Sequence, residues 1–234
     1  MCVRIVQHST RMEFVTALKV PIVFQEWQGG DTLPQFNIAP GRGIRMFHRL
    51  YQGKLKCDPI RWGYRSPRAV ERREPIEPCV LIERAVLGLY YRHMWMSGRV
   101  LIPINGWYEW TGDNTNRLPW YIRLKDDQPM FLAAVTNYVP EKAQTVERGC
   151  AIIADAGAAG LLDPGDLRPV VFTPEHAMRW LEPWLERDEA IYLASKYSRP
   201  ATDFEWYRVG TAVNNVDVAG KLDWEATKAL NKPI

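Results

Sequence analysis

The sequence has few cysteines, no long apolar run and almost no net charge, and the first two shortages each argue against a class of protein. Four cysteines lie far apart among 234 residues without a Cys-x-x-Cys pair, which excludes a disulfide framework and argues against a zinc site. No run approaches the roughly 18 apolar residues of a membrane span. The N-terminus lacks the basic start and apolar stretch of a secretory signal, so we expect a cytoplasmic protein without a membrane partner.

The charges are nearly balanced, at 30 Lys and Arg against 27 Asp and Glu, so the whole chain neither requires nor excludes nucleic acid. Arginine is nevertheless concentrated in residues 61–73, RWGYRSPRAVERR, beside Trp62 and Tyr64. Arginines neutralise phosphates and aromatic rings stack on bases, which favours nucleic-acid binding by this segment. The alternative is a solvated basic loop.

The composition is 47% hydrophobic, which is enough for one large core, and no repeat or linker divides the chain. We therefore expect a single domain over residues 1–234. Thr10 and Glu13 have the spacing of a capping box, which predicts a helix start at this point. The predicted helices span residues 11–18, 84–95 and 174–187.

Short runs with strand character lie between these helices and outnumber them. The strands do not alternate regularly with helices, as a βαβ fold would require. We therefore expect an α+β fold with a mostly antiparallel, barrel-like sheet. The predicted strands span residues 43–50, 99–104, 107–110, 120–124, 130–135, 150–154, 170–172 and 204–208.

Cys2 follows the initiator methionine, which methionine aminopeptidase removes when the next residue is small. The new N-terminus would carry an α-amine with a reference pKa of about 7.7–8.0 and a thiol with one near 8.5. Such an amine attacks an aldehyde to form a Schiff base, and the thiol then closes a thiazolidine ring. Abasic DNA offers such an aldehyde. Alternatively, Cys2 attacks an amide and removes Met1 autocatalytically, or it is an inert cysteine placed there by chance.

Motifs from Met1 to about Asn215 resemble those of the SOS-response-associated peptidase (SRAP) family in order and spacing. The most specific match is GRVLIPINGWYEW at residues 98–110. The others are MCVR at 1–4, FNIAP at 36–40, RWGY at 61–64, RPVVFTPE at 168–175 and VNNV at 213–216. The resemblance implies a compact α+β fold with a sheet curled into a pseudo-barrel, and neither a metal nor an organic cofactor.

The resemblance also implies a function in the DNA damage response. Members of the family crosslink through the N-terminal cysteine to abasic sites in single-stranded DNA, so the protein would associate with the nucleoid when bound. Cys2 matches the nucleophile and Glu109 the catalytic carboxylate. In a strand, Trp107 and Glu109 share one face and Tyr108 and Trp110 share the other. We expect aromatic neighbours to raise the pKa of Glu109, which suits proton transfer; the alternative is an exposed strand carboxylate.

A DNA groove is implied by the same resemblance. Arg4, Asn37 and Pro40 match positions that line the groove, and Trp110 matches an aromatic residue that stacks on a base. Four arginines are further candidates for phosphate contact: Arg65, Arg68, Arg99 and Arg168. For the last two, the sequence does not distinguish phosphate contact from structural ion pairing.

The chain departs from the family pattern near the expected site. Cys79 and Leu81 stand where the family has an asparagine that positions the sugar and an arginine that contacts DNA, and Gly165 stands where the catalytic histidine is expected. Val3 replaces a flexible glycine beside the nucleophile. The competing hypotheses are therefore a catalytically impaired DNA-binding relative and a thiol autopeptidase that acts only on its own N-terminus. Surface or structural roles are predicted for the histidines: His8, His48, His93 and His176.

Overall fold

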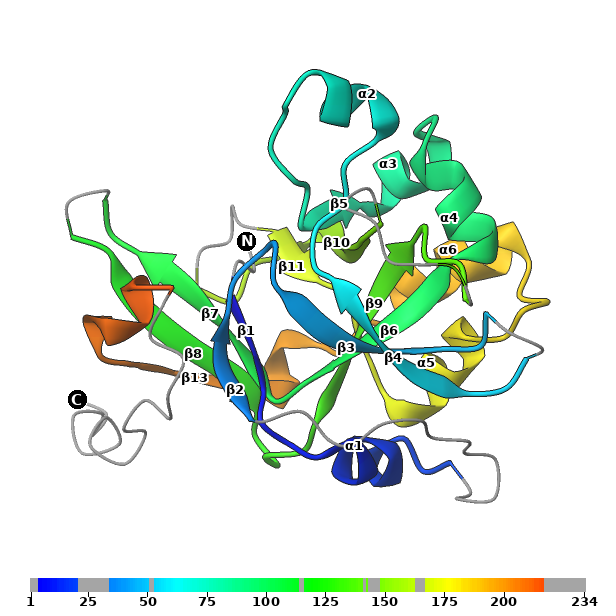
Figure 1. Ribbon diagram of the computed structural model, residues 1–234. Helices are drawn as coiled ribbons and strands as arrows, with labels where there is room; N and C mark the ends of the chain where they lie inside the picture. The colour runs from blue at the N-terminus through cyan, green and yellow to red at the C-terminus, as the bar shows by residue number, and fades with distance from the viewer. Residues whose placement is uncertain are drawn as a thin grey trace.

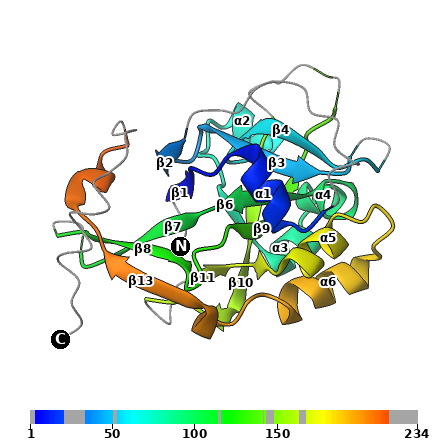
Figure 2. The same cartoon turned by 90° about the horizontal axis from the view of Figure 1, so that it is seen from below.

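The computed structural model describes residues 4–20, 34–50, 53–113, 116–140, 142, 148–162 and 167–216. In these residues the strands form two open sheets, and most helices cover one face of the larger sheet (Figures 1 and 2). The predicted α+β class with mostly antiparallel strands is confirmed. No helix in the described part of the chain is both long and apolar enough to cross a membrane.

The smaller sheet is antiparallel throughout and has the strand order β13-β8-β7-β1-β2. It forms the left side of the molecule in Figure 1. Two of its members, β1 and β2, have no counterpart among the predicted strands. The bounds are Arg4–Gln7 for β1, Gln35–Ile38 for β2, Gly106–Thr111 for β7, Leu118–Leu124 for β8 and Phe204–Arg208 for β13.

The larger sheet has the order β11-β10-β9-β6-β3-β4, with β12 paired to β9 and β5 paired to β10. The β5 and β10 pair is parallel, whereas the other pairs are antiparallel. The bounds are Gly43–His48 for β3, Lys56–Arg61 for β4, Cys79–Leu81 for β5, Arg99–Ile104 for β6, Met130–Thr136 for β9, Cys150–Ala159 for β10, Leu167–Pro169 for β11 and Val171–Phe172 for β12.

The two sheets meet where β6 ends and β7 begins, and Asn105 forms the corner. Its side-chain Oδ1 accepts hydrogen bonds from the backbone N–H groups of His8 and Ser9, at 2.9 and 3.1 Å. Gly106 follows, and a Cβ at this position would lie only 2.2 Å from the Tyr121 ring. The corner therefore needs an amide acceptor followed by a residue without a side chain.

Three apolar clusters fill the spaces around the sheets. The first lies between the sheets and includes Trp107 from β7 and Ile102 from β6. The second lies between the larger sheet and the helices and includes the fully buried Trp95. The third covers the outer face of the smaller sheet and includes Tyr108 and Tyr121. The first four residues of β7 are thus buried on both faces of the smaller sheet, so this strand carries apolar residues at successive positions.

The helix predicted at residue 11 is confirmed as α1 (Arg11–Ala17). The Thr10 hydroxyl accepts from the backbone N–H of Glu13 at 3.2 Å, and the Glu13 carboxylate accepts from the N–H of Thr10 at 2.6 Å. These are the two hydrogen bonds of a capping box. A further short helix, α2 (Pro67–Glu71), follows Ser66.

Two predicted helices have the wrong extent. The one predicted over 84–95 is divided by Gly88 into α3 (Ile82–Leu87) and α4 (Tyr91–Ser97). The one predicted over 174–187 ends early, as α5 (Pro174–Trp180), before α6 (Arg187–Lys196) begins. Two short 3-10 turns, Ala201–Asp203 and Thr211–Asn214, flank β13.

Arg99 joins the ends of two helices to the larger sheet. Its side chain is buried, and the Cζ atom lies 5.8 Å from the centre of the Trp180 ring. The guanidinium donates at 2.8 to 3.2 Å to backbone carbonyls in the last turns of α4 and α5 or just after α5: those of Trp95, Met96, Trp180, Glu182 and Leu185. Burial lowers the pKa of Arg99, but these acceptors stabilise its charged form.

We expect Arg99→Met to lower the free energy of unfolding by about 3 kcal/mol, because it leaves several buried carbonyls without a donor. Urea denaturation should show a lower midpoint at an unchanged m value. The control is Arg92→Met on α4, where the side chain is exposed; it should shift stability by less than about 0.5 kcal/mol. Equal effects of the two substitutions would contradict the assigned role.

Candidate functional site

Glu109 lies on β7 and is only 2% exposed. Its Oε1 atom accepts a hydrogen bond from the indole Nε1 of Trp107 at 2.9 Å, on the face between the sheets. Tyr108 and Trp110 belong to the cluster on the opposite face. The predicted alternation along β7 is confirmed, and the alternative of an exposed carboxylate is wrong. The indole holds a buried carboxylate in one orientation.

Two guanidinium groups lie close to the ring of Trp110. The Cζ atoms of Arg4 and Arg117 are 5.7 and 5.2 Å from the centre of its ring, and the indole Nε1 donates to Asn214 Oδ1 at 2.7 Å. Partial burial and the nearby charge of Arg117 both lower the pKa of Arg4. Two cations beside one half-buried aromatic ring are suited to a flat group that carries an anion, such as a nucleotide.

Asn37 fixes the chain segment that contacts Trp110. Its side chain is 7% exposed, and Nδ2 donates to the backbone carbonyls of Val213 and Asn215 at 3.2 and 2.9 Å. These two bonds hold the segment that contains Asn214 over the outer face of the smaller sheet. The structure therefore brings Arg4, Asn37 and Trp110 into one neighbourhood.

Pro40 lies in the turn between β2 and β3, immediately before Gly41. The Gly41 N–H donates to the carbonyl of Trp62 at 2.7 Å, so the turn is attached to the RWGY segment. Gly41 has a φ of +91°, and Gly63 in the RWGY segment has a φ of +110°. Both values lie in the region that favours glycine. The turn that carries Pro40 is thus built from two motifs distant in sequence.

The aromatic residues of the basic segment do not reach the surface, so the prediction that they stack on bases is wrong. Trp62 is fully buried and its indole Nε1 donates to the Pro78 carbonyl at 3.0 Å. Tyr64 is also buried and packs edge-on against Tyr91, with ring centres 5.2 Å apart. Both rings are packed in the core and are not available to stack on a base.

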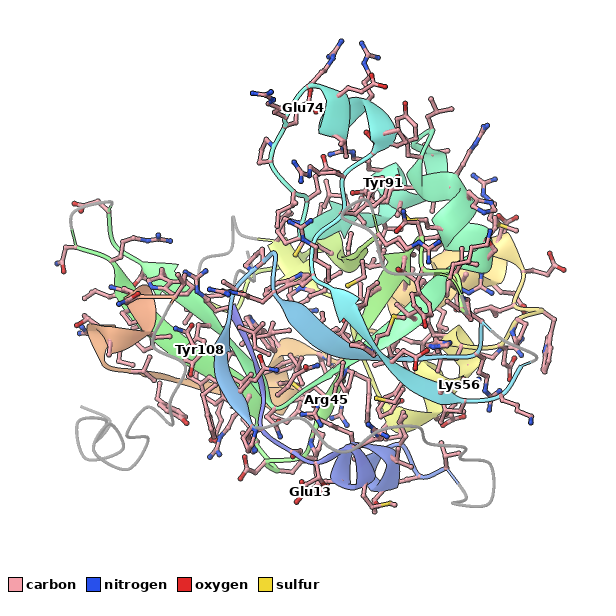
Figure 3. The ribbon with its side chains drawn as sticks, viewed as in Figure 1. Glu13, Arg45, Lys56, Glu74, Tyr91 and Tyr108 are labelled. Atoms are coloured by element: carbon pink, nitrogen blue, oxygen red, sulfur yellow. The ribbon has the colours of Figure 1, made fainter. Side chains whose placement is uncertain are left out.

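Except for Arg61 on β4, the arginines of this segment lie in or beside α2, which projects from the body of the molecule in Figure 1. Arg68 is exposed, and the Nη1 atom of Arg65 donates to the Glu74 carbonyl at 3.4 Å. Glu74 marks the end of this projection in Figure 3. Arg73, at the end of the helix, has a φ of +56°, which favours glycine. The α2 segment therefore displays positive charge away from the core.

Arg99 and Arg168, the other two arginines proposed to contact phosphate, do not belong to the α2 segment. The guanidinium of Arg99 donates to backbone carbonyls at the ends of α4 and α5. Its role is therefore to hold these helix ends, and not to contact phosphate or to form an ion pair. Arg168 is on β11, directly opposite Asp155 on β10.

Three of the four cysteines are in the described residues. Cys57 is buried, and burial raises the pKa of Cys79 and of Cys150 to about 12. Both of these thiols therefore remain protonated, and so weakly nucleophilic, at neutral pH. Cys2, together with Val3 and Gly165, lies outside the described residues.

The histidines have the surface or structural positions predicted for them. His48 is buried, with Nε2 2.9 Å from Asp58 Oδ2, and His176 packs on Tyr197 beside the cap of α5. His8 and His93 are exposed. No cluster of His, Cys, Asp and Glu side chains in the described part of the chain could hold a metal ion.

Two residues of the site were missed from the sequence. Arg117 comes just before β8 in the β7 and β8 hairpin, where Trp110 pairs with Pro119. Arg117 is two residues from Pro119, so a hairpin prediction would have placed it diagonally across from Trp110. Asn214 carried no such signal, because only the folded chain brings it to Trp110.

Comparison with known proteins agrees with these motifs. YedK of Escherichia coli (strain K12), named an abasic site processing protein, is 30% identical over 94% of this chain and 97% of its own length. YoqW of Bacillus phage SPbeta, of the same description, is 29% identical over 80% of this chain and 83% of its own. A phage-related protein from Bordetella bronchiseptica has a similar structure, with a TM-score of 0.76, 27% identity and coverage of 89% of this chain and 94% of its own. Residues 1–216 match the family described as SOS response associated peptidase (SRAP), and the chain therefore belongs to that family.

Proposed function

We propose that this protein binds abasic sites in single-stranded DNA and forms a covalent thiazolidine adduct through Cys2 after removal of Met1. The main support for this proposal is the pairing of β1 with β7, in which Arg4 lies opposite Tyr108. Arg4 follows Cys2 by two residues, and Tyr108 precedes the buried carboxylate of Glu109. The strand that begins just after the nucleophile therefore runs beside the strand that carries the carboxylate.

The reaction consists of two additions to one carbon. The α-amine of Cys2 adds to the aldehyde carbon of the ring-opened sugar, and water leaves as the imine forms. The thiol then adds to the imine carbon, its proton passes to the nitrogen, and the five-membered ring is complete. The net reaction joins protein and DNA and releases water. Glu109 supplies and accepts protons for these steps, since Gly165 and Cys79 offer no such group.

The choice of nucleophile is supported by the state of the other thiols. Cys57 is buried, and Cys79 and Cys150 are held protonated by their raised pKa values. Cys2 combines a thiol with an α-amine, whose reference pKa of about 7.7–8.0 leaves a useful fraction uncharged at neutral pH. The adduct should therefore form at this cysteine alone.

The proposed DNA interface is centred on Trp110. A base stacks on the indole while Arg4 and Arg117 contact phosphates, and Asn37 and Pro40 shape the adjoining chain. Arg65 and Arg68 on the α2 segment and Arg168 on β11 provide further phosphate contacts. Arg99 is left out of this interface because its donors are already bonded to the helix ends.

Loss of the family histidine and asparagine supports a second candidate, a DNA-binding relative with impaired chemistry. Gly165 has no side chain for proton transfer, and the thiol of Cys79 stays protonated. This candidate predicts that the protein binds abasic DNA but forms no covalent adduct.

We expect Met1-processed protein to form a denaturation-resistant adduct with single-stranded DNA that contains an abasic site, and Cys2→Ala to abolish it. The variant keeps an N-terminal amine, so borohydride should still trap its imine, which separates the two additions. Intact mass establishes that Met1 has been removed, and Cys57→Ala is the matched control. A denaturation-resistant adduct from Cys2→Ala without borohydride would contradict the mechanism, and binding by the parent protein without any adduct would favour the impaired relative.

Glu109→Gln should slow adduct formation by roughly 100-fold, because the amide keeps the acceptor for the Trp107 indole but cannot transfer a proton in the same way. Stopped time courses on denaturing gels give the rate, and fluorescence anisotropy should show DNA affinity within about twofold of the parent protein. Glu175→Gln, at an exposed position of α5, serves as control. An unchanged rate would remove Glu109 from the proposed chemistry.

Arg117→Ala and Trp110→Ala should weaken DNA binding in distinguishable ways. Loss of one phosphate contact should reduce the slope of log affinity against log salt by about 0.7 for a single strand. Loss of the stacking ring should weaken binding by about 1–3 kcal/mol without changing that slope. The exposed Lys196→Ala on α6 is the control. If Arg117→Ala leaves the salt dependence unchanged, Arg117 does not contact phosphate.

A further inference from the structure

A groove of about 630 Å³ opens between α3, α4 and the start of α6. Its lining includes Leu87, Leu89 and Met96, which are 72, 67 and 46% exposed. Large apolar side chains that gather at this degree of exposure usually mark a surface that another molecule covers. The volume falls within the range of sites that bind ligands or peptide side chains.

Local sequence explains why these residues face outward. Gly88 ends α3 in an extended conformation, and a Cβ there would lie 2.5 Å from the carbonyl oxygen of Arg84. Only glycine allows this tight turn, which carries Leu87 on one side and Leu89 on the other. On α4, Met96 lies four residues after Arg92, so the two side chains share the outer face of the helix.

The polar residues that line the groove are exclusively basic. Its charged or ionisable lining residues are Arg92, His93 and Arg187, and the lining contains no carboxylate. Among the described residues none of the three forms a salt bridge, whereas Arg84 nearby is paired with Glu77 at 2.6 Å. A lining that combines apolar side chains with arginines outside any such salt bridge complements a ligand that combines apolar groups with carboxylates.

The groove lies at the opposite end of the molecule from the Trp110 site. In Figures 1 and 2, α3, α4 and α6 are on the right, and β7, β8 and β13 are on the left. Figure 3 shows the same separation between Tyr91 on α4 and Tyr108 on β7. A molecule in the groove would therefore leave the proposed DNA interface open.

We propose that this groove binds an acidic segment of another protein, whose apolar side chains cover Leu87, Leu89 and Met96 while its carboxylates meet Arg92 and Arg187. A groove fits a single extended or helical chain segment, which can place apolar side chains in it and charged ones beside it. Leucine and methionine side chains also provide no flat ring on which a base stacks, which disfavours a nucleic acid. The proposal is independent of the chemistry at Cys2.

The test measures fluorescence anisotropy of the full chain with labelled short peptide pools. In the first pool, Asp or Glu alternates with Leu, Ile or Phe. In the second, Lys replaces the acidic residues, and in the third, Ser replaces the apolar ones. The first pool should bind at least about tenfold more tightly than either of the others, and added salt should weaken its binding.

Variants of the protein identify the surface. Leu87→Ser with Leu89→Ser should reduce binding of the acidic pool by about tenfold, and Arg92→Glu with Arg187→Glu should reverse the preference in favour of the lysine pool. Tyr192→Ser and Lys196→Glu, at exposed positions of α6, should change nothing. All variants should retain DNA binding, which shows that they are folded.

Three results would overturn the proposal. The first is equal binding of the acidic and lysine pools, or binding that the leucine variants do not affect. The second is binding to vesicles of anionic lipid, lost in the leucine variants, without binding to the acidic pool, which would assign the surface to a membrane. The third is self-association in analytical ultracentrifugation that Leu87→Ser abolishes, which would assign it to a second copy of this chain.

Discussion

The corner at Asn105 and Gly106 is the constraint on which the rest of the structure depends. It transfers the chain from the larger to the smaller sheet without a loop, so that β7 is buried on both faces. The Asn105 side chain accepts hydrogen bonds from the N–H groups of His8 and Ser9. Gly106 has no Cβ, which leaves room for the Tyr121 ring. Since β7 carries both Glu109 and Trp110, the position of the proposed site follows from this corner.

The two faces of β7 separate the two physical demands of the proposed reaction. Glu109 points into the space between the sheets, where burial and the Trp107 indole fix one carboxylate orientation. Trp110 lies on the outer face, where Arg4 and Arg117 place positive charge beside a ring that solvent reaches. Proton transfer benefits from a dry, ordered group, whereas capture of a polyanion benefits from exposed cations.

Short sequence patterns predicted correctly those features that depend only on residues close together in the sequence. The capping box at Thr10 and the alternation of WYEW are examples, because each depends on residues a few positions apart. The break at Gly88 was missed because it depends on a close approach to the Arg84 carbonyl. Trp62 and Tyr64 were predicted to stack on bases because they lie among arginines, yet tertiary packing buries both rings, as it also buries Arg99. Family motifs supplied the Arg4, Asn37 and Trp110 neighbourhood, which no local pattern contains.

The bonds from Asn37 to Val213 and Asn215 span 176 and 178 residues of sequence. Contacts of such long range form late, since the intervening chain must first be ordered. During synthesis, Arg4 and Trp110 therefore leave the ribosome long before the segment that completes their surroundings. Cys2 is synthesised at the start of the chain, whereas the surface around Trp110 is completed only when residues 213–215 have been synthesised. The proposed nucleophile therefore exists well before its DNA-binding surface is folded.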